Sequence, residues 1–395
     1  MTAGVRKLDF SNTKIAFASM SNLELMRARF LFKMMGFSTF VKAGPRLASM
    51  SLRFHLPVRS IIKNTLFKQF CGGESIGECS ALIDKLSEAG IGTILDFATE
   101  GINSEKLYDY TMKETLRNID YAATTDHIPF CVFKVTGLAR FKLLERVSEG
   151  QILSLSEQEE YKKVKDRIDR IAATAAEKKV RLFIDAEESW IQDSIDELTW
   201  DAILKYNKEE PIIFNTVQMY RHDRFAFLKK MYEEACREKV YLGIKLVRGA
   251  YLEKENDRAK VRGEQSPIHK SKLDTDKDYD EALRYCIEHI EKISVCAGTH
   301  NEPSTLLLAN LIDEYNLDRS DYRAEFAQLM GMSDNLTFNL ADQGYRVSKY
   351  VPYGPIATVI PYLGRRAAEN SSIAGQTSRE LQLIESEVQR RGLID

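Results

Sequence analysis

Two adjacent arginines near the C-terminus, in the segment PYLGRRAAEN (residues 361–370), are the first side chains whose types suggest chemistry. Arginine keeps its charge in proteins, so Arg365 and Arg366 need either water or an anionic partner. If the segment is a helix, Tyr362, one of the arginines and Glu369 share a face, because their spacing is i, i+3 or i+4, and i+7. A charged helix face is usually solvated, so the segment alone leaves both interpretations open.

The composition is that of an ordinary globular protein and predicts no metal site. The chain has 395 residues, of which 44% are hydrophobic and 29% are charged, and its net charge is −2. A chain of this length can bury a large core. The histidines show no metal-ligand spacing, so zinc is not predicted. No Cys-x-x-Cys pair occurs, and we expect six reduced core cysteines: Cys71, Cys79, Cys131, Cys236, Cys286 and Cys296.

The charge is distributed unevenly along the chain. Residues 1–70 carry 12 Lys and Arg against Asp9 and Glu24, so the rest of the chain is acidic. Such an arm is typical of a transit peptide, a membrane-surface helix, or a basic arm packed on the acidic body. The pattern continues to about residue 70 without a small-residue cleavage signal, which favours an ordered arm, with peripheral membrane contact as a further option. No apolar run of about 18 residues predicts a transmembrane helix.

Short apolar runs alternate with longer amphipathic stretches from residue 90 onward. The apolar runs are residues 93–97, 130–135, 181–186, 212–218, 241–247, 294–299, 324–329 and 348–352. This alternation predicts a parallel sheet with helical crossovers, and eight repeats match a (β/α)8 barrel of roughly 250 residues. A doubly wound open sheet is the alternative, but neither a G-x-G-x-x-G turn nor a P-loop follows the first strand.

The predicted strands end in polar side chains, and barrel active sites form at these ends. The side chains at or just after the eight strand ends are Asp96, Glu100, Lys134, Asp185, Glu187, Glu188, Gln218, Lys245, Arg248, Thr299, His300, Asn301, Leu329 and Tyr350. Each polar one alone is more often a satisfied rim residue than a ligand contact. Together they describe a rim of mixed charge, which is typical of a site for a polar ligand.

The cations of this rim suggest a ligand with two anionic groups. A phosphate or pyrophosphate would suit Arg248, Lys272, Thr275 and His300, and a small carboxylate would suit the guanidinium groups of Arg365 and Arg366. The residues themselves do not fix the reaction. Lys134 or Lys245 could form a Schiff base, as in a barrel aldolase, whereas redox chemistry would require a bound cofactor. A non-enzymatic regulator or scaffold is a third option, although the acidic body argues against nucleic acid as a partner.

A series of motifs in chain order resembles the proline dehydrogenase family of flavoenzymes. The motifs are FKVTGLAR, FIDAEES, KLVRGAYLEKE, LDTDKDYD, GTHN, FAQLMGMSD, KYVPYG and YLGRRAAEN, within residues 70–390. The resemblance implies a distorted (β/α)8 TIM barrel, α/β in class, that binds FAD without a Rossmann fingerprint. It also implies a C-terminal helix over the barrel mouth. We expect an N-terminal helical arm over residues 1–89 and the proline dehydrogenase barrel over residues 90–395.

The resemblance also implies roles for individual residues. Arg365, Arg366 and Lys134 would hold the carboxylate of L-proline, with Asp185 orienting Lys134, and Glu100 would pair with a helix arginine at the mouth. The substrate pocket would further include Tyr251, Leu329, Tyr350, Tyr362 and Glu369. The FAD would be lined by Gln218, Lys245, Arg248, Ala250, Lys272, Thr275, Thr299, His300 and Asn301. Many bacterial members of the family have arginine at the position of Lys245, so the tuning of the flavin is expected to differ here.

The reaction implied by the resemblance is hydride transfer from proline to FAD, which yields Δ1-pyrroline-5-carboxylate in the first step of proline catabolism to glutamate. The electrons would pass to a quinone, and the arm is a candidate for approaching the membrane. The expected location is the cytoplasm, with peripheral contact at the inner face of the cytoplasmic membrane as an option, or the mitochondrion in a eukaryote. Hydroxyproline is the rival substrate within the family, and the bulk of Tyr350 favours proline over it.

Overall fold

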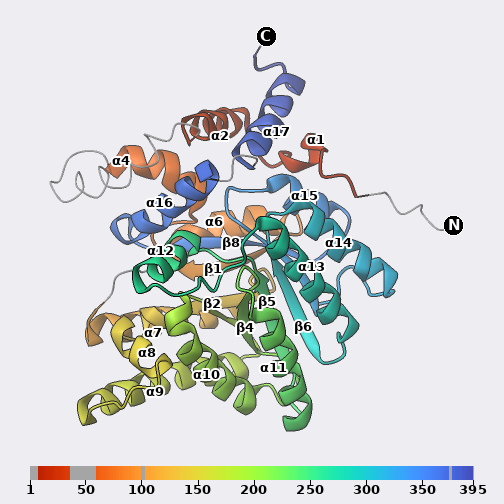
Figure 1. Cartoon of the computed structure of the whole chain (residues 1–395). Coiled ribbons are helices and arrows are strands. Elements are labelled where there is room, and N and C mark those ends of the chain that lie inside the picture. The colour runs from red at the N-terminus through yellow and green to blue at the C-terminus, as the bar shows by residue number, and fades with distance from the viewer. Residues whose placement is uncertain (1–7, 36–58, 99–102, 373–375, 395) are drawn as a thin grey trace. The chain divides into compact units, whose positions relative to one another are not determined.

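Eight parallel strands form a closed barrel in sequence order (Figure 1). The computed structural model describes residues 8–35, 59–98, 103–372 and 376–394, without the side chains of residues 61, 367–372 and 376–378. The strands are β1 (Gly92–Phe97), β2 (Phe130–Lys134), β3 (Arg181–Asp185), β4 (Ile213–Gln218), β5 (Leu242–Val247), β6 (Ile293–Gly298), β7 (Ala324–Leu329) and β8 (Val347–Tyr353). The predicted (β/α)8 barrel is therefore confirmed, and the open-sheet alternative is wrong.

The chain divides into two compact units, residues 1–100 with 328–395, and residues 101–327. The helices of the first unit are α1 (Thr13–Ala16), α2 (Asn22–Met35), α4 (Arg59–Ile62), the π-helix η1 (Lys63–Phe67), α5 (Lys68–Phe70), α6 (Ile76–Ser87), α15 (Asp334–Asp342), α16 (Ile356–Ser372) and α17 (Gln376–Arg390). Those of the second unit are α7 (Glu105–Ala122), the 3₁₀-helix η2 (Val135–Gly137), α8 (Phe141–Ser148), α9 (Leu155–Glu177), α10 (Ser189–Tyr206), α11 (Arg224–Glu238), α12 (Leu252–Arg262), α13 (Lys272–Glu288) and α14 (Glu302–Glu314). The domain boundary that the sequence predicts between residues 89 and 90 stays a prediction.

Aromatic side chains form a layer in the second unit's strands on the amino-terminal side of their polar ends. The rings of Phe130 and Phe183 stack with centroids 4.1 Å apart, and Phe214 meets Phe183 edge to face at 5.5 Å. Gly243 on β5 makes room for this layer, because a Cβ there would lie 2.4 Å from the Phe214 ring. Side chains alternate along a strand, so the residues two and four places beyond each phenylalanine point to the same side. The aromatic layer therefore lies beneath the polar side chains that end β2, β3 and β4.

Side-chain caps fix where several helices of the second unit begin. Ser154 and Glu157 form a reciprocal capping box at the start of α9. Ser271 accepts a hydrogen bond from the backbone N–H of Asp274 at α13, and Asn301 does the same for Ser304 at α14. These caps set the first turns of the helices that follow strands β5 and β6.

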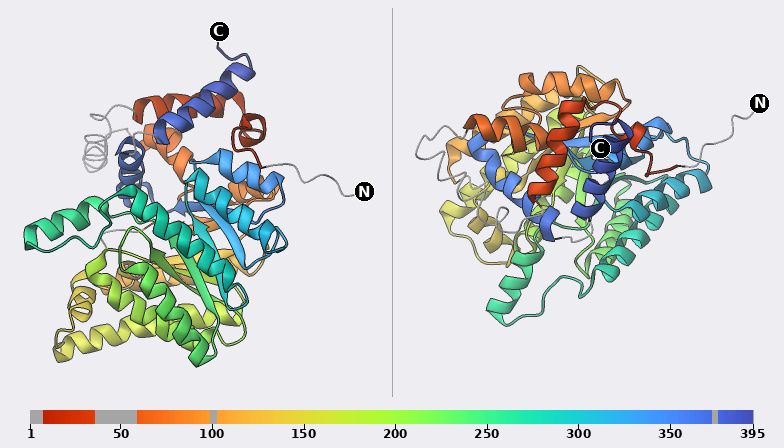
Figure 2. Two further views of the ribbon diagram at one scale, coloured as in Figure 1. Left: turned by 45° about the vertical axis from the view of Figure 1, so that its right-hand side comes forward. Right: turned by 90° about the horizontal axis from the view of Figure 1, so that it is seen from above.

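The described part of the N-terminal arm is helical and packs on the C-terminal helices of its own unit. The core they share includes Phe17, Leu25 and Phe32 from the arm and Val359 and Leu383 from α16 and α17. Figure 2 shows α2 in red beside α17 in blue. The guanidinium of Arg391 also donates to the carbonyl of Phe17 at 2.7 Å. The prediction of an ordered, packed arm agrees with this arrangement, while residues 1–7 and 36–58 lie outside the described ranges.

Five of the six cysteines are buried, as predicted, and all six are free thiols. The prediction of a core position is wrong for Cys236, which is exposed on α11. Cys236 follows Ala235 by one residue, so the turn of the helix places it off the inward face on which Met231 and Ala235 are buried. Within the described ranges, every helix is too short or too polar to cross a membrane.

Candidate functional site

Three charged side chains meet where β2 and β3 end beside the carboxyl half of β5. The carboxylate of Asp185 lies between two ammonium groups, with Oδ2 2.7 Å from Lys134 Nζ and Oδ1 2.6 Å from Lys245 Nζ. Thr216 on β4 donates a longer hydrogen bond of 3.4 Å to the same Oδ1. Four neighbouring strands thus contribute to one polar cluster. The predicted residues Lys134, Asp185 and Lys245 are brought together by the structure.

The two lysines of this cluster differ in exposure. The side chain of Lys134 is 25% exposed, whereas that of Lys245 is 7% exposed and lies 4.9 Å from the centroid of the Phe183 ring. Burial opposes the charged form of Asp185, but the charges of Lys134 and Lys245 outweigh burial and hold the pKa of Asp185 well below its ordinary value. Asp185 is therefore an anion at neutral pH, and the three groups together carry one net positive charge. Lys134 is the member of the cluster that reaches toward solvent.

Gln218 ends β4 two residues beyond Thr216, so it points to the same side of the strand. Its side chain is 2% exposed, and its Oε1 has no hydrogen-bond partner among the groups that the structure describes. Leaving a buried amide oxygen without a donor costs about 1–3 kcal/mol, and few native groups do so. The Oε1 of Gln218 is therefore available to accept a hydrogen bond from a bound ligand.

Arg248, just after β5, is held by several groups at once. Its Nε lies 2.7 Å from the carboxylate of Asp276, and its terminal nitrogens donate to Thr299 and Ser304 at 2.6 and 2.9 Å. The guanidinium also lies 4.3 Å from the centroid of the Tyr279 ring. Lys272 contacts the same carboxylate of Asp276. Burial raises the pKa of Asp276, but the hydrogen bonds from Lys272 and Arg248 outweigh burial and hold this pKa below its ordinary value.

Asp276 brings together Arg248 and Lys272, the two cations that the sequence assigns to a phosphate group. The other predicted cofactor residues of α13 and of the GTHN motif lie on the segments that carry these contacts. Arg248 still has N–H groups to spare, since a guanidinium carries five donors. Thr275 is buried on α13, and Asn301 caps α14. His300, which precedes Asn301 in the GTHN motif, is half-buried. These positions are compatible with the predicted roles, which stay predictions.

The turn after β5 has an unusual backbone. Gly249 has φ +136°, a conformation that L side chains rarely adopt, and a Cβ there would lie 2.4 Å from the Tyr220 ring. Ala250 follows as an exposed residue, and Tyr251 is the N-cap of α12. Lys254 lies 5.4 Å from the centroid of the Tyr251 ring. The glycine therefore brings the backbone onto Tyr220, which fixes where Ala250 and Tyr251 lie.

The first unit carries the double arginine on α16. This helix begins at Ile356, five residues before the predicted segment, and contains Pro361. Arg366 is buried, and its guanidinium lies 5.3 Å from the centroid of the Tyr362 ring, which confirms that these two residues share a face. Arg365 is half-buried on the same helix. The interpretation of a fully solvated arginine pair is therefore wrong for Arg366.

The other predicted residues of the first unit lie near strand ends or outside the description. Tyr350 is buried on β8, and Leu329 is half-buried at the end of β7. Glu100 lies outside the described residues, and so does the side chain of Glu369, whose backbone belongs to α16. The predictions made for Glu100 and Glu369 stay predictions.

Two side chains that hold the site in place were not assigned such a function from the sequence: Asp276 had no predicted role, and Glu187 was predicted only as a rim residue. Asp276 ties Arg248 to Lys272, and its signal was its place in the motif LDTDKDYD. Glu187 follows β3 in FIDAEES and accepts hydrogen bonds from both the backbone N–H and the hydroxyl of Thr136. Within the described residues, no group of three or more His, Cys, Asp or Glu is placed to hold a metal ion.

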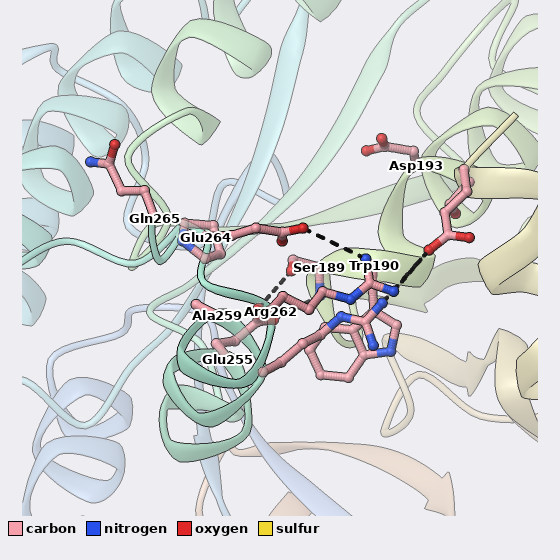
Figure 3. Close-up of a pocket in the computed structure, with 12 residues that line it drawn as sticks. Ser189, Trp190, Asp193, Glu255, Ala259, Arg262, Glu264 and Gln265 are labelled. Carbon is pink, nitrogen blue, oxygen red and sulfur yellow. Dashed lines mark hydrogen bonds and ion pairs between the residues drawn. The ribbon is translucent and has the colours of Figure 1, made fainter.

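A separate cavity of about 260 Å³ lies between α10 and α12 in the second unit (Figure 3). Its lining includes Ser189, Trp190, Glu255, Arg258 and Arg262, and none of the predicted site residues. The carboxylate of Glu255 accepts hydrogen bonds from the backbone and hydroxyl of Ser189 at 2.7 and 2.6 Å. These hydrogen bonds across the cavity connect α12 to the start of α10. We do not assign the cavity to the reaction.

Comparison with known proteins gives a consistent family. The sequence model of the family described as Proline dehydrogenase matches residues 79–379. The mitochondrial proline dehydrogenase 1 of Dictyostelium discoideum is 34% identical over 98% of this chain and 75% of its own length. The hydroxyproline dehydrogenase of Xenopus laevis is 29% identical over 97% of this chain and 90% of its own length.

A solved structure shares the fold. The proline utilization A protein of Bdellovibrio bacteriovorus, inactivated by N-propargylglycine, superposes with a TM-score of 0.72 at 23% identity over 91% of this chain. The present chain spans 38% of the length of that protein. At this identity the likeness supports the barrel fold and nothing finer.

Proposed function

Because this chain belongs to the proline dehydrogenase family and is therefore an oxidoreductase, we propose that it oxidises L-proline to Δ1-pyrroline-5-carboxylate with FAD. This would be the first step of proline catabolism to glutamate. The observation that carries the proposal is the cluster of Lys134, Asp185 and Lys245 beside Gln218, whose buried Oε1 has no described partner. An accessible cation beside an unsatisfied acceptor suits an anionic substrate next to a hydrogen-bonding cofactor.

The residues of the second unit fit FAD in three respects. The Oε1 of Gln218 can accept from a ring N–H, and Lys245 places a positive charge on the same cluster of strand ends. Arg248 and Lys272, both bound to Asp276, supply positive charge for a pyrophosphate. Thr275 lies on the same helix as Lys272, and Thr299, which accepts a hydrogen bond from Arg248, is followed by His300 and Asn301. Ala250 follows Gly249, whose backbone packs against the Tyr220 ring, and this contact fixes the position of the turn assigned to FAD. When bound, FAD would accept the hydride that leaves the proline ring.

The residues assigned to the substrate act mainly by positioning. We assign the carboxylate of proline to Arg365 and Arg366 in the first unit and to Lys134 in the second. Arginine matches a carboxylate with two parallel hydrogen bonds, and holding one end of a small substrate orients its reacting carbon. Asp185 keeps the ammonium of Lys134 in place through a 2.7 Å contact. Tyr251, Leu329, Tyr350, Tyr362, Glu369 and Glu100 are assigned to the walls of the pocket.

The alternative of a Schiff-base aldolase is less compatible with this geometry. A Schiff base needs a neutral amine as nucleophile. Both candidate lysines instead present ammonium groups to the carboxylate of Asp185 at 2.7 and 2.6 Å. An ammonium ion held by a carboxylate is not a nucleophile.

We further propose a quinone as the final electron acceptor and the N-terminal arm as the part that meets a membrane surface. On α2, Leu23 and Phe30 are 81% and 59% exposed and lie seven residues apart, which puts them on one face. Exposed apolar side chains on a helix are typical of interfacial contact. Several relatives are named as mitochondrial proteins. We propose the same location if the source is a eukaryote, and the cytoplasmic face of the inner membrane if it is a bacterium.

The proposal is tested by replacing Arg365 and Arg366 singly with methionine and measuring proline oxidation with an artificial electron acceptor. Each change should raise KM for proline about 10-fold or more while bound flavin stays at the wild-type level, because charge-assisted hydrogen bonds to the carboxylate are lost. Arg284→Met is the matched control, since Arg284 is an exposed arginine on α13 with no assigned role. Wild-type KM values in both test variants would overturn the assignment.

Hydroxyproline is the second candidate substrate, because one relative is named a hydroxyproline dehydrogenase. Tyr350 is buried on β8, and a tyrosine there would crowd a ring hydroxyl. We therefore expect kcat/KM to be higher for L-proline than for trans-4-hydroxy-L-proline. The reverse order would make hydroxyproline the substrate and leave the flavin assignment unchanged.

A further inference from the structure

A pair of hydrogen bonds joins the segments that follow β2 and β3, immediately beyond the Lys134–Asp185 ion pair. Lys134 and Asp185 are register partners in the two strands. Two residues further along each chain, Thr136 and Glu187 are also joined: the backbone N–H of Thr136 donates to Glu187 Oε1 at 3.0 Å, and its hydroxyl donates to Oε2. Both carboxylate oxygens of Glu187 are therefore engaged by one residue.

Glu187 is also fixed from its own backbone. Its N–H donates to Oε1 of Gln192 on α10 at 2.8 Å, and Nε2 of Gln192 donates to Asp196 at 2.9 Å. The side chain of Glu187 is only 3% exposed. The carboxyl group thus has a fixed place, close to Lys134 and away from bulk water.

Burial destabilises the ionised form of the Glu187 carboxyl group, and its direct partners compensate only in part. Thr136 offers neutral donors, and no cation binds Glu187 directly among the described contacts. The charged groups that act on Glu187 are Lys134, at the end of β2, and Glu188, the next residue in the chain. Lys134 is itself paired with Asp185 of β3, and the carboxylate of Glu188 binds Lys254 of α12 at 2.8 Å. Burial raises the pKa of Glu187 to about 7, although the charge of Lys134 and the hydrogen bonds from Thr136 oppose the rise.

The proton on Glu187 changes the charge of the whole cluster. With Glu187 neutral, two lysines and Asp185 give a net charge of +1, which favours an anionic ligand. With Glu187 ionised, the net charge of the four groups is zero. The local attraction for a carboxylate is weaker in the second state.

We propose that Glu187 is a positioning residue for Lys134, and that its proton controls how tightly the cluster binds the substrate carboxylate. The inference rests on the proposed contact between Lys134 and the carboxylate of proline. Glu187 itself does not contact the substrate. Its charge acts on Lys134, and its hydrogen bonds to Thr136 fix the segment that directly follows Lys134 at the end of β2.

The test is the binding of cyclopentanecarboxylate, which has the ring size and carboxylate of proline but no amine to titrate. Its inhibition constant against proline oxidation is measured from about pH 6 to about pH 8.5 for the wild type and for Glu187→Gln. The wild-type affinity should weaken about three- to tenfold as the pH rises, because a nearby negative charge appears. The glutamine variant should keep the tighter affinity of the low-pH wild type across the range.

Two further variants separate the inference from general damage. Glu188→Gln removes a neighbouring negative charge, so it should keep the amplitude of the wild-type profile and move its midpoint to lower pH. Thr136→Val removes the hydroxyl donor, keeps the backbone N–H, and should move the midpoint of the profile to higher pH, because the ionised form of Glu187 loses a donor. This second variant keeps the test decisive if the glutamine variant does not fold.

The outcomes distinguish the inference from the proposed function. Superimposable pH profiles for the wild type, Glu187→Gln and Thr136→Val, with proline oxidation intact, would overturn the role of Glu187 alone. A wild-type protein that neither binds flavin nor oxidises proline would overturn the proposed function instead.

Discussion

Three carboxylates at one strand end, in the segment DAEE, have very different surroundings. Asp185 is buried between two lysine ammonium groups, and Glu187 is buried against the neutral donors of Thr136. Glu188 binds a single lysine, Lys254, whose side chain is 61% exposed. The pKa of Asp185 is held below its ordinary value by its cations, whereas burial raises the pKa of Glu187 to about 7. Similar burial therefore leads to opposite shifts, and the charge of the partner decides the direction.

The comparison predicts the largest effect at Asp185. In Asp185→Ala the ammonium groups of Lys134 and Lys245 lose their shared carboxylate, and we expect the free energy of unfolding at pH 7 to fall by about 3–5 kcal/mol. Urea unfolding followed by tryptophan fluorescence measures the change. Asp185→Asn is the control for volume and should fall between the wild type and the alanine variant.

The same comparison fixes the pH dependence of the loss. Because the folded-state pKa of Asp185 lies below its ordinary value of 3.8, its stabilising effect is present above that value and is lost as the pH falls through the folded pKa. The gap between the wild type and Asp185→Ala should therefore narrow in strong acid. A loss below about 1 kcal/mol at pH 7 would show that the ion pairs contribute little net stability.

Glu187 should show the opposite dependence, with an intermediate magnitude. Its raised pKa means that its contribution to stability is fully present below its ordinary value of 4.5 and is lost as the pH rises through about 7. A glutamine has no proton to lose. From pH 5 to pH 8, the stability of Glu187→Gln relative to the wild type should therefore rise by on the order of 2–3 kcal/mol. A relative stability that does not change with pH would mean that Glu187 titrates normally.

The smallest effect is expected at the exposed pair of Glu188 and Lys254. Lys254→Ala removes an ion pair with an N–O distance of 2.8 Å, but solvent screens an ammonium group that is mostly exposed. We expect a loss of less than about 1 kcal/mol in the free energy of unfolding, reduced further in high salt. A loss as large as that of Asp185→Ala would break the ranking on which the comparison depends.

Much of the fold was accessible from the sequence, because each barrel strand is a continuous apolar run between amphipathic helices. Every predicted strand bound lies within one residue of the observed one, from TILDF at β1 to SKYVP at β8. The convergence of Lys134, Asp185 and Lys245 also followed, since the carboxyl ends of parallel strands meet at one end of a barrel.

The ties that hold the site were not accessible in the same way. The hydrogen bonds between Thr136 and Glu187 depend on the register of β2 against β3, and the apolar pattern does not specify that register closely. The contact between Arg248 and Asp276 depends on how α13 packs beside β5 and β6. The difference in exposure between Lys134 and Lys245 is likewise a matter of depth along the strand rather than of residue type.

The most direct test of whether this chain is a flavoenzyme that oxidises L-proline is the absorption spectrum of the purified protein, recorded without oxygen before and after L-proline is added. We predict a yellow protein with a flavin absorption band at about 450 nm. This band should bleach when proline is added, because the substrate reduces the cofactor. Borohydride should trap no substrate on a lysine. A colourless protein that becomes covalently labelled with a carbonyl substrate and borohydride, or a flavin band that proline leaves unchanged, would contradict the account.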